Sequence, residues 1–309
     1  MKIRTTASAL ALALAAVTAP AGAQDGNQTA QTGPSPELIA FVKNLHKQTG
    51  DVAIPAAHAV MHLGTRYYFL GPDEAKRVLV DVWHNPPSAV SNVLGLILPA
   101  DKTLADNIWG AVVTYQDSGY VPDTDASSQD YDKVLNDLRE GEAADNEARK
   151  KEGYPELSVV GWAQQPSYDK ASHSLIWARD LKSSDSTVDG LNYDVRSLGR
   201  HGVLSLNMIW DMPHLAEVRT AAADLGKAAG FEKGSTYADY DKSVDKTAEY
   251  GLAGLVAAGV GVVAIKKLGF LALVLGFGKK LILLVVVAGA AIWRGIKRIF
   301  GRKTDTLEG

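Results

Sequence analysis

Polar side chains that can do chemistry gather around one predicted β-hairpin, at Asn192, Asp194, Arg196, Arg200 and His201. Alternate side chains of a strand share a face, so the first three are expected to point the same way. Such a group can bind a ligand, or it can be a buried Asp–Arg pair that orders the hairpin. The sequence therefore predicts a candidate ligand-binding patch here and leaves both interpretations open.

A second group of oxygen ligands lies in one acidic run, which comprises Asp123, Asp125, Ser127, Asp130 and Asp132. A calcium-binding loop alternates such oxygens, with Gly at its sixth position and a carboxylate at its twelfth. Counted from Asp123, those positions hold Ser128 and Val134, so the pattern fails. The four aspartates are weak metal candidates, and the alternative is a loop followed by a helix capped by Ser127 or Ser128.

Histidine and nucleophile patterns indicate no established active site. His58 and His62 are four residues apart, which suits a metal on a helix, but their surroundings look extended, where that spacing spans about 13 Å. The chain has no Cys, which removes thiolate catalysis and cysteine metal sites. The signatures of serine hydrolases, zinc proteases and phosphate-binding loops are absent. No cofactor is expected.

Charge is distributed unevenly along the 309 residues. The formal net charge is −3, but residues 24–250 hold 21 basic and 33 acidic residues, a net charge of −12. Nucleic-acid binding requires a basic face. We therefore expect no nucleic-acid partner.

The elements that would position these residues predict an α+β fold. Helices are expected over residues 71–82, 127–151 and 213–228, and strands over residues 93–98 and 109–115. Four consecutive strand-like runs predict an antiparallel meander, at residues 157–163, 172–179, 191–198 and 203–210. Residues 51–68 look extended and are expected to add one or two strands. The predicted architecture is an antiparallel sheet packed with helices, followed by a C-terminal transmembrane helical segment.

The N-terminus is typical of a secretory signal peptide over residues 1–23. Lys2 and Arg4 form its positive region, Ala7–Val17 forms its apolar region, and small residues lead to Ala23. Residues 24–36 are polar and predict a disordered leash. The main domain is then expected at residues 37–248, exported and folded without disulfides.

The C-terminal stretch predicts a membrane segment over residues 249–300 and a basic cytoplasmic tail over residues 301–309. It is almost wholly apolar from Tyr250 to Trp293, interrupted by two Lys pairs. Positive clusters mark the cytoplasmic side, so one span at residues 281–300 is the simplest topology. The alternatives are a hairpin of two spans and one long helix over residues 268–293. The expected location is the inner membrane, with the main domain in the periplasm.

Small residues recur at a four-residue spacing in Ala253, Ala257 and Gly261. On one helical face they permit close approach of two backbones, which predicts a homo-oligomer. The alternative is that Ala and Gly are simply common in membrane helices. Membrane lipids and an unidentified envelope protein are the other expected partners.

Several ordered motifs carry a resemblance that spans about Gly50 to Phe300. They include Trp83-His84-Asn85-Pro86-Pro87, the run from Trp109 to Tyr115, Gly119-Tyr120-Val121-Pro122-Asp123 and Leu191-Asn192-Tyr193-Asp194-Val195-Arg196. Through them the chain resembles a bacterial family of predicted membrane-anchored proteins that has only an unknown-function label. The resemblance implies no activity. His84 stands where the family pattern usually has Gly, so it gains no weight as a site.

Three functional hypotheses follow. The first is a non-enzymatic, membrane-anchored envelope protein whose exported domain is an interaction or assembly module. The alternative is a membrane-tethered hydrolase or metal-dependent enzyme that uses the acidic run or the polar hairpin. A third is a membrane-active protein whose apolar blocks insert when it oligomerises.

Overall fold

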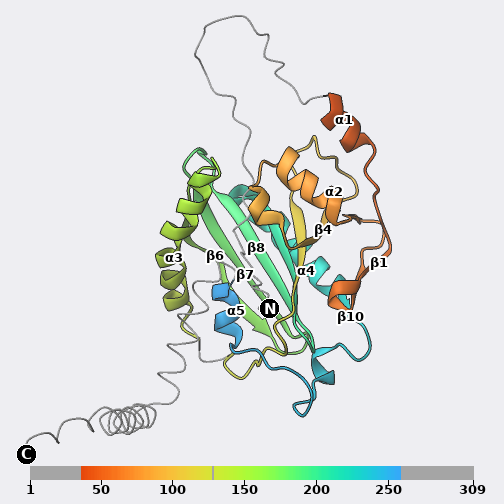
Figure 1. The fold of residues 1–309 in the computed structure, drawn as a ribbon, viewed down its shortest axis with the longest axis vertical. Helices are drawn as coiled ribbons and strands as arrows, with labels where there is room; N and C mark the ends of the chain where they lie inside the picture. The colour runs from red at the N-terminus through yellow and green to blue at the C-terminus, as the bar shows by residue number, and fades with distance from the viewer. Residues whose placement is uncertain (1–35, 127–128, 259–309) are drawn as a thin grey trace, which may run out of the picture. The chain divides into compact units, whose positions relative to one another are not determined.

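A seven-stranded antiparallel sheet organises the computed structural model of this chain, which describes residues 36–126 and 129–258 (Figure 1). Its strand order is β3-β4-β5-β9-β8-β7-β6. The predicted meander is confirmed, and its strands are β6 (Leu157–Asp169), β7 (Ser174–Ser183), β8 (Gly190–Leu198) and β9 (Val203–Asp211). Consecutive strands pair in order, because their short connections allow only neighbouring antiparallel strands.

The earlier strands join the meander through β9. β5 (Gly110–Gln116) pairs with β9 along its whole length, from Gly110 opposite Ile209 to Gln116 opposite Val203. β4 (Val93–Pro99) pairs with β5, and β3 (Tyr67–Leu70) pairs with β4 at the edge of the sheet. The strands predicted at residues 93–98 and 109–115 are therefore confirmed.

A smaller antiparallel sheet has the order β1-β2-β10. β1 (Asp51–Ile54) and β2 (Ala59–His62) account for the extended region that the sequence predicts, with a 3-10 turn, η1 (Pro55–Ala57), between them. The third strand, β10 (Ala229–Phe231), was not predicted. It follows α4 directly, so one segment supplies both a helix and the edge of this sheet.

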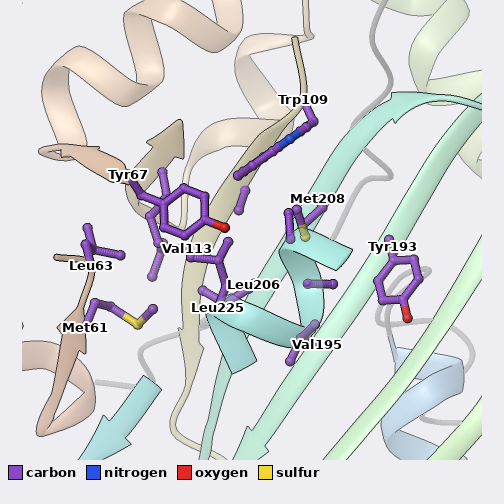
Figure 2. Close-up of a cluster of buried hydrophobic side chains, with 14 of the residues drawn as sticks. Met61, Leu63, Tyr67, Trp109, Val113, Tyr193, Val195, Leu206, Met208 and Leu225 are labelled. Carbon is purple, nitrogen blue, oxygen red and sulfur yellow. The ribbon is translucent and has the colours of Figure 1, made fainter. Parts of the chain in front are cut away.

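Helices cover both faces of the large sheet. α4 (Leu215–Ala228) buries Val218 and Leu225 in the larger core, against the sheet face that carries Tyr193 and Val195 (Figure 2). α2 (Pro72–Arg77) and the π-helix η2 (Val78–Val82) contribute to a second core with strand β4. The predicted helices over residues 71–82 and 213–228 are thus confirmed, the first with a π-helical second half.

The long charged helix α3 (Tyr131–Lys151) starts later than predicted. Its N-cap is Asp130, which accepts a hydrogen bond from the backbone N–H of Lys133 at 3.0 Å. The cap predicted at Ser127 or Ser128 was therefore wrong, because the helix begins after Asp130 and an aspartate caps as well as a serine. The remaining helical elements are α1 (Pro36–Lys43), η3 (Pro87–Val90), η4 (Met212–His214), η5 (Tyr237–Asp239) and α5 (Leu252–Ala258).

Side chains of α3 occupy part of the outer edge of β6. Arg139 donates to the carbonyl of Val159 at 3.1 Å, Glu142 accepts from its N–H at 2.7 Å, and Asn146 bonds both backbone groups of Leu157. These contacts fill the backbone positions that another strand would use. The helix therefore protects this stretch of the edge against pairing with a further strand.

The predicted targeting and membrane segments lie outside the described residues. They are the signal peptide at 1–23, nearly all of the leash at 24–36, the span at 281–300 and the tail at 301–309. Within residues 36–126 and 129–258, no helix combines the length and hydropathy needed to cross a bilayer.

Candidate functional site

The predicted polar face of β8 forms a buried ion cluster with β7. The Asp194 carboxylate is fully buried between two guanidinium groups. Arg196 Nη2 donates to Asp194 Oδ1 at 2.9 Å, and Arg179 Nη2 lies 3.5 Å from Asp194 Oδ2. Arg179 is the cross-strand partner of Asn192, which places it in the same layer. We call Arg179, Asn192, Asp194 and Arg196 the polar layer.

Arg196 is fixed by three kinds of contact. Besides Asp194, its Nη1 donates to the hydroxyl of Ser205 on β9 at 2.8 Å. Its guanidinium also lies over the ring of Trp177, 5.1 Å from the ring centre. The side chain thus links β7, β8 and β9, and the predicted Asp–Arg pair that orders the hairpin is present.

The polar layer leaves several hydrogen-bonding atoms without partners among the described residues. They are both amide atoms of Asn192, Nε and Nη1 of Arg179, Nε of Arg196, and Oδ2 of Asp194, which has only the 3.5 Å ion-pair contact with Arg179. Asn192 and Arg179 are 1% and 2% exposed, so each such group lies in a poorly hydrated interior. An unpaired buried polar group typically costs about 1–3 kcal/mol. Burying the polar layer therefore lowers the free energy of unfolding. The packing of the elements that cover it must offset this loss.

Asp145 of α3 adds an anion to this region. Burial, partly opposed by the Arg179 guanidinium and assisted by the neighbouring Glu142, raises the pKa of Asp145 to about 6. Burial also lowers the pKa of Arg179. Because Asp145 and Arg179 influence each other, α3 lies over the polar layer with a carboxylate facing it.

The pKa of Asp145 predicts a pH-dependent contribution to stability. Between about pH 4 and pH 6 the folded protein keeps a proton on Asp145 that the unfolded chain has lost, so this group's contribution falls as the pH rises. We therefore expect the unfolding free energy of Asp145→Asn, relative to wild type, to increase across that window and level off above it. Urea unfolding at several pH values measures this difference.

Glu147→Gln is the matched control for that experiment, because Glu147 is an exposed carboxylate on the same helix. Its stability relative to wild type should show no such rise. A difference between Asp145→Asn and wild type that stays constant from pH 4 to pH 7 would show that Asp145 titrates normally.

Arg200 and His201 do not belong to the polar layer. Arg200 makes two hydrogen bonds to the carboxylate of Asp245, at 2.8 and 3.1 Å, and another to the carbonyl of Gly234 at 3.1 Å. The backbone carbonyl of His201 accepts from Gly119 at 2.9 Å. The predicted five-residue patch is therefore corrected to two separate groups, because β8 ends at Leu198 and the turn carries the last two residues away.

The acidic run is also dispersed. Asp123 accepts from the Tyr168 hydroxyl at 2.9 Å, Asp130 caps α3, and Asp132 is exposed. Asp125 accepts from Gln129 at 2.7 Å and from the backbone N–H of Leu252 at 3.1 Å. In the part of the chain that the structure describes, no group of three or more His, Asp or Glu side chains is arranged to hold a metal.

The paired histidines have separate local roles. His58 follows η1 with a left-handed φ of 48°, whereas His62 ends β2 and bonds the carboxylate of Asp51 at 2.8 Å. The extended setting that the sequence indicates is confirmed for His62.

A network of aromatic side chains at one end of the sheet was missed. The Tyr168 hydroxyl lies 3.1 Å from Nδ1 of His173, whose ring stacks on Tyr237 at 4.2 Å. Tyr120 stacks between Tyr237 and Tyr240, at 4.5 and 3.8 Å. These residues come from three distant segments, so no spacing in the sequence could have grouped them. They hold the end of the sheet against residues 237–247, which lead to α5.

The first turns of the predicted membrane segment are packed into the domain. In α5, Leu252, Leu255, Val256 and Ala257 are at most 1% exposed, and the helix lies against α3. The Asp125 carboxylate accepts from the first backbone N–H groups of α5, which caps the helix from a distant loop. The folded part therefore continues past the boundary expected at residue 248.

Tyr250 connects α5 to the polar layer. Gln116 donates to its hydroxyl at 2.7 Å, burial raises its pKa, and Arg196 is close enough to oppose that rise. Residues 250–257 thus lie on the same side of the sheet as Arg196, where α3 also lies.

The predicted oligomerisation face is only partly described. Ala257 is 1% exposed because the domain itself covers it, Ala253 is half-buried, and Gly261 lies outside the described residues. Self-association through this face stays a prediction, and Ala257 can join it only if α5 leaves the domain.

Comparison with known proteins gives a family but no activity. No curated protein matches the chain. Among solved structures, the solution structure of cyanobacterial PsbP (CyanoP) from Synechocystis sp. PCC 6803 is similar at a TM-score of 0.35 and 8% identity, covering 67% of this chain and 98% of that one. That likeness is too weak to support an argument about function. A family model described as "Protein of unknown function (DUF2167)" matches residues 46–290, and the chain therefore belongs to this family.

Proposed function

We propose that this protein is a membrane-anchored envelope protein whose α+β domain is a non-enzymatic interaction or assembly module. The domain faces the periplasm and is held at the inner membrane by the apolar stretch that begins at residue 251. The basic tail lies in the cytoplasm.

The docking of α5 is the observation that carries this proposal. Four of its side chains are buried, Asp125 caps it, and it belongs to the apolar stretch that continues to Trp293. The chain that leads from the domain toward the proposed anchor is therefore part of the fold as far as Ala257. We infer that such a domain presents its folded surfaces to other envelope components.

The burial and pairing of the candidate site residues favour an interaction module over an enzyme. Asp194, which the hydrolase or metal-enzyme alternative would use, is buried and paired with Arg179 and Arg196. Three of the four aspartates of the acidic run cap helices or bond a tyrosine, and Asp132 is exposed. An active site needs reactive groups that converge on an accessible cleft, and these groups serve packing instead.

Fractionation of membranes tests the proposal. We expect the full chain to stay in the membrane pellet after washing with alkaline carbonate. A chain that ends at residue 258 keeps α5 but loses the rest of the apolar stretch, and we expect carbonate to release it. Release of the full chain would contradict the proposal, and retention of the shortened chain would place the anchor elsewhere.

A further inference from the structure

A groove of about 580 Å³ lies away from the polar layer, between α4 and the ends of β3, β4 and β5. Its lining comprises Thr65, Arg66, Tyr67, Pro99, Ala100, Asp101, Trp109, Glu217, Thr220, Ala221 and Asp224. We call it the α4 groove. Its volume falls in the range of sites that bind small molecules or single side chains.

Regular elements form both walls, so the α4 groove is preformed. Glu217, Thr220, Ala221 and Asp224 lie three and four residues apart, which places them on one face of α4. The opposite wall is the connection between β3 and β4, where the N–H of Ala100 donates to the carbonyl of Arg66 at 2.9 Å. The width of the groove is therefore set by packed secondary structure.

One end of the groove is already occupied by a cation from the chain itself. Arg66 pairs with Asp224 at 2.5 Å and lies over the Tyr67 ring, 5.3 Å from its centre. The Tyr67 hydroxyl also donates to Asp224 at 3.3 Å, and these contacts lower the pKa of that carboxyl. This end shows that the groove accommodates a guanidinium between an aromatic face and a carboxylate.

The rest of the groove has anions without matching cations. Asp101 and Glu217 are exposed, and neither has an ion pair or a side-chain hydrogen bond within the described part of the chain. With Asp224, the lining carries three carboxylates and a single Arg. The surplus of negative charge favours a positively charged ligand.

Tyr67 and Trp109 supply an apolar floor. Their ring centres are 5.7 Å apart with the planes tilted by 59°, and Figure 2 shows the two side chains next to each other in the core. Trp109 is 3% exposed, and it belongs with Tyr67 to the larger hydrophobic core. The floor therefore consists of two packed aromatic rings that can contact the apolar part of a ligand.

The geometry points to the α4 groove as a binding site for an organic cation. The apolar stem of the ligand lies on Tyr67 and Trp109, and its ammonium group bonds Asp101 and Glu217. The ligand is a primary amine, either a free small molecule or the side chain of a lysine in a partner. This inference goes beyond the proposed function, because membrane anchoring does not require the groove.

Calorimetric titration of the full chain in nanodiscs of zwitterionic lipid tests the inference, with empty discs as reference. The probes are 2-phenylethylamine, which is a cation at neutral pH, and 2-phenylethanol, its neutral analogue. We expect the amine to bind at least tenfold more tightly than the alcohol. A blocked lysine dipeptide is the second cationic probe, and whichever cation binds more tightly identifies the source of the ligand.

Variants locate the binding. Asp101→Asn and Glu217→Gln should each weaken amine binding about threefold, and the double variant about tenfold. The matched control is Glu232→Gln, an exposed carboxylate outside the groove, which should leave the dissociation constant unchanged. All three positions are exposed, so folding should be unaffected. Equal binding of amine and alcohol, no binding at millimolar concentration, or a double variant that binds like wild type would each overturn the inference.

Discussion

Replacing Asp194 by Leu is expected to destabilise the folded domain by about 3–5 kcal/mol. Asp194 is fully buried, and it is the anion shared by Arg179 and Arg196. Removing it leaves two guanidinium groups facing each other in an interior that already contains unpaired donors. Urea-induced unfolding, followed by tryptophan fluorescence, measures the loss.

A triple variant separates the contribution of the buried charges to stability from the contribution of side-chain packing. Replacing Arg179, Asp194 and Arg196 together by Met, Leu and Met removes all the charges while keeping side chains of similar length. Because a buried ion pair gives little net stability over apolar residues, this variant should recover at least half of the loss. Asp81→Asn in the exposed Arg77–Asp81 pair is the surface control and should change little.

The polar layer would have to be reinterpreted if Asp194→Leu fell within about 1 kcal/mol of wild type. That result would mean that solvent reaches the guanidinium groups and that α3 and α5 do not cover them. If the triple variant were as unstable as Asp194→Leu, the loss of stability would instead be due to packing.

Replacing Gly119 by Ala is expected to destabilise the domain by about 3 kcal/mol. Gly119 has a φ of +86°, and an added Cβ would lie 2.5 Å from the carbonyl oxygen of Lys246. That carbonyl accepts from Tyr120 at 2.9 Å, and Ala248 donates back to Tyr120 at 2.8 Å. The new methyl group would therefore push away the segment that leads to α5.

Gly153 provides the matched control, because its φ of +82° is similar but nothing lies within 4 Å of the position of an added Cβ. Gly153→Ala should destabilise the domain by only about 1 kcal/mol, which is the cost of the left-handed backbone conformation for alanine. Urea unfolding gives the difference between the variants, and limited proteolysis should cut Gly119→Ala early between residues 240 and 258. Equal losses for both variants would show that residues 246–248 are not pressed against Gly119.

Strand positions were predictable because each meander strand has its own apolar pattern. Alternation along β8 correctly placed Asn192, Asp194 and Arg196 on one face. The partner Arg179 could not be predicted, since it lies on another strand and its position depends on register. Local chemistry thus identified three of the four residues of the polar layer, and only the pairing of strands identified the fourth.

Long-range contacts explain what the sequence did not reveal. Arg200 bonds Asp245 and Asp125 caps α5, and nothing in the local sequence of either residue indicates its partner. Residues 252–257 have the same apolar composition as the stretch that follows them, so hydropathy alone assigned them to the membrane. Their burial depends on a complementary surface formed by α3, which the sequence pattern does not encode.

The partition of the full chain in carbonate-washed membranes tests the central claim most directly. That claim is that the folded domain is anchored by the apolar stretch whose first turns it buries. The account predicts that the intact chain remains with the membranes while a chain ending at residue 258 is released. Recovery of the intact chain in the carbonate supernatant would contradict it.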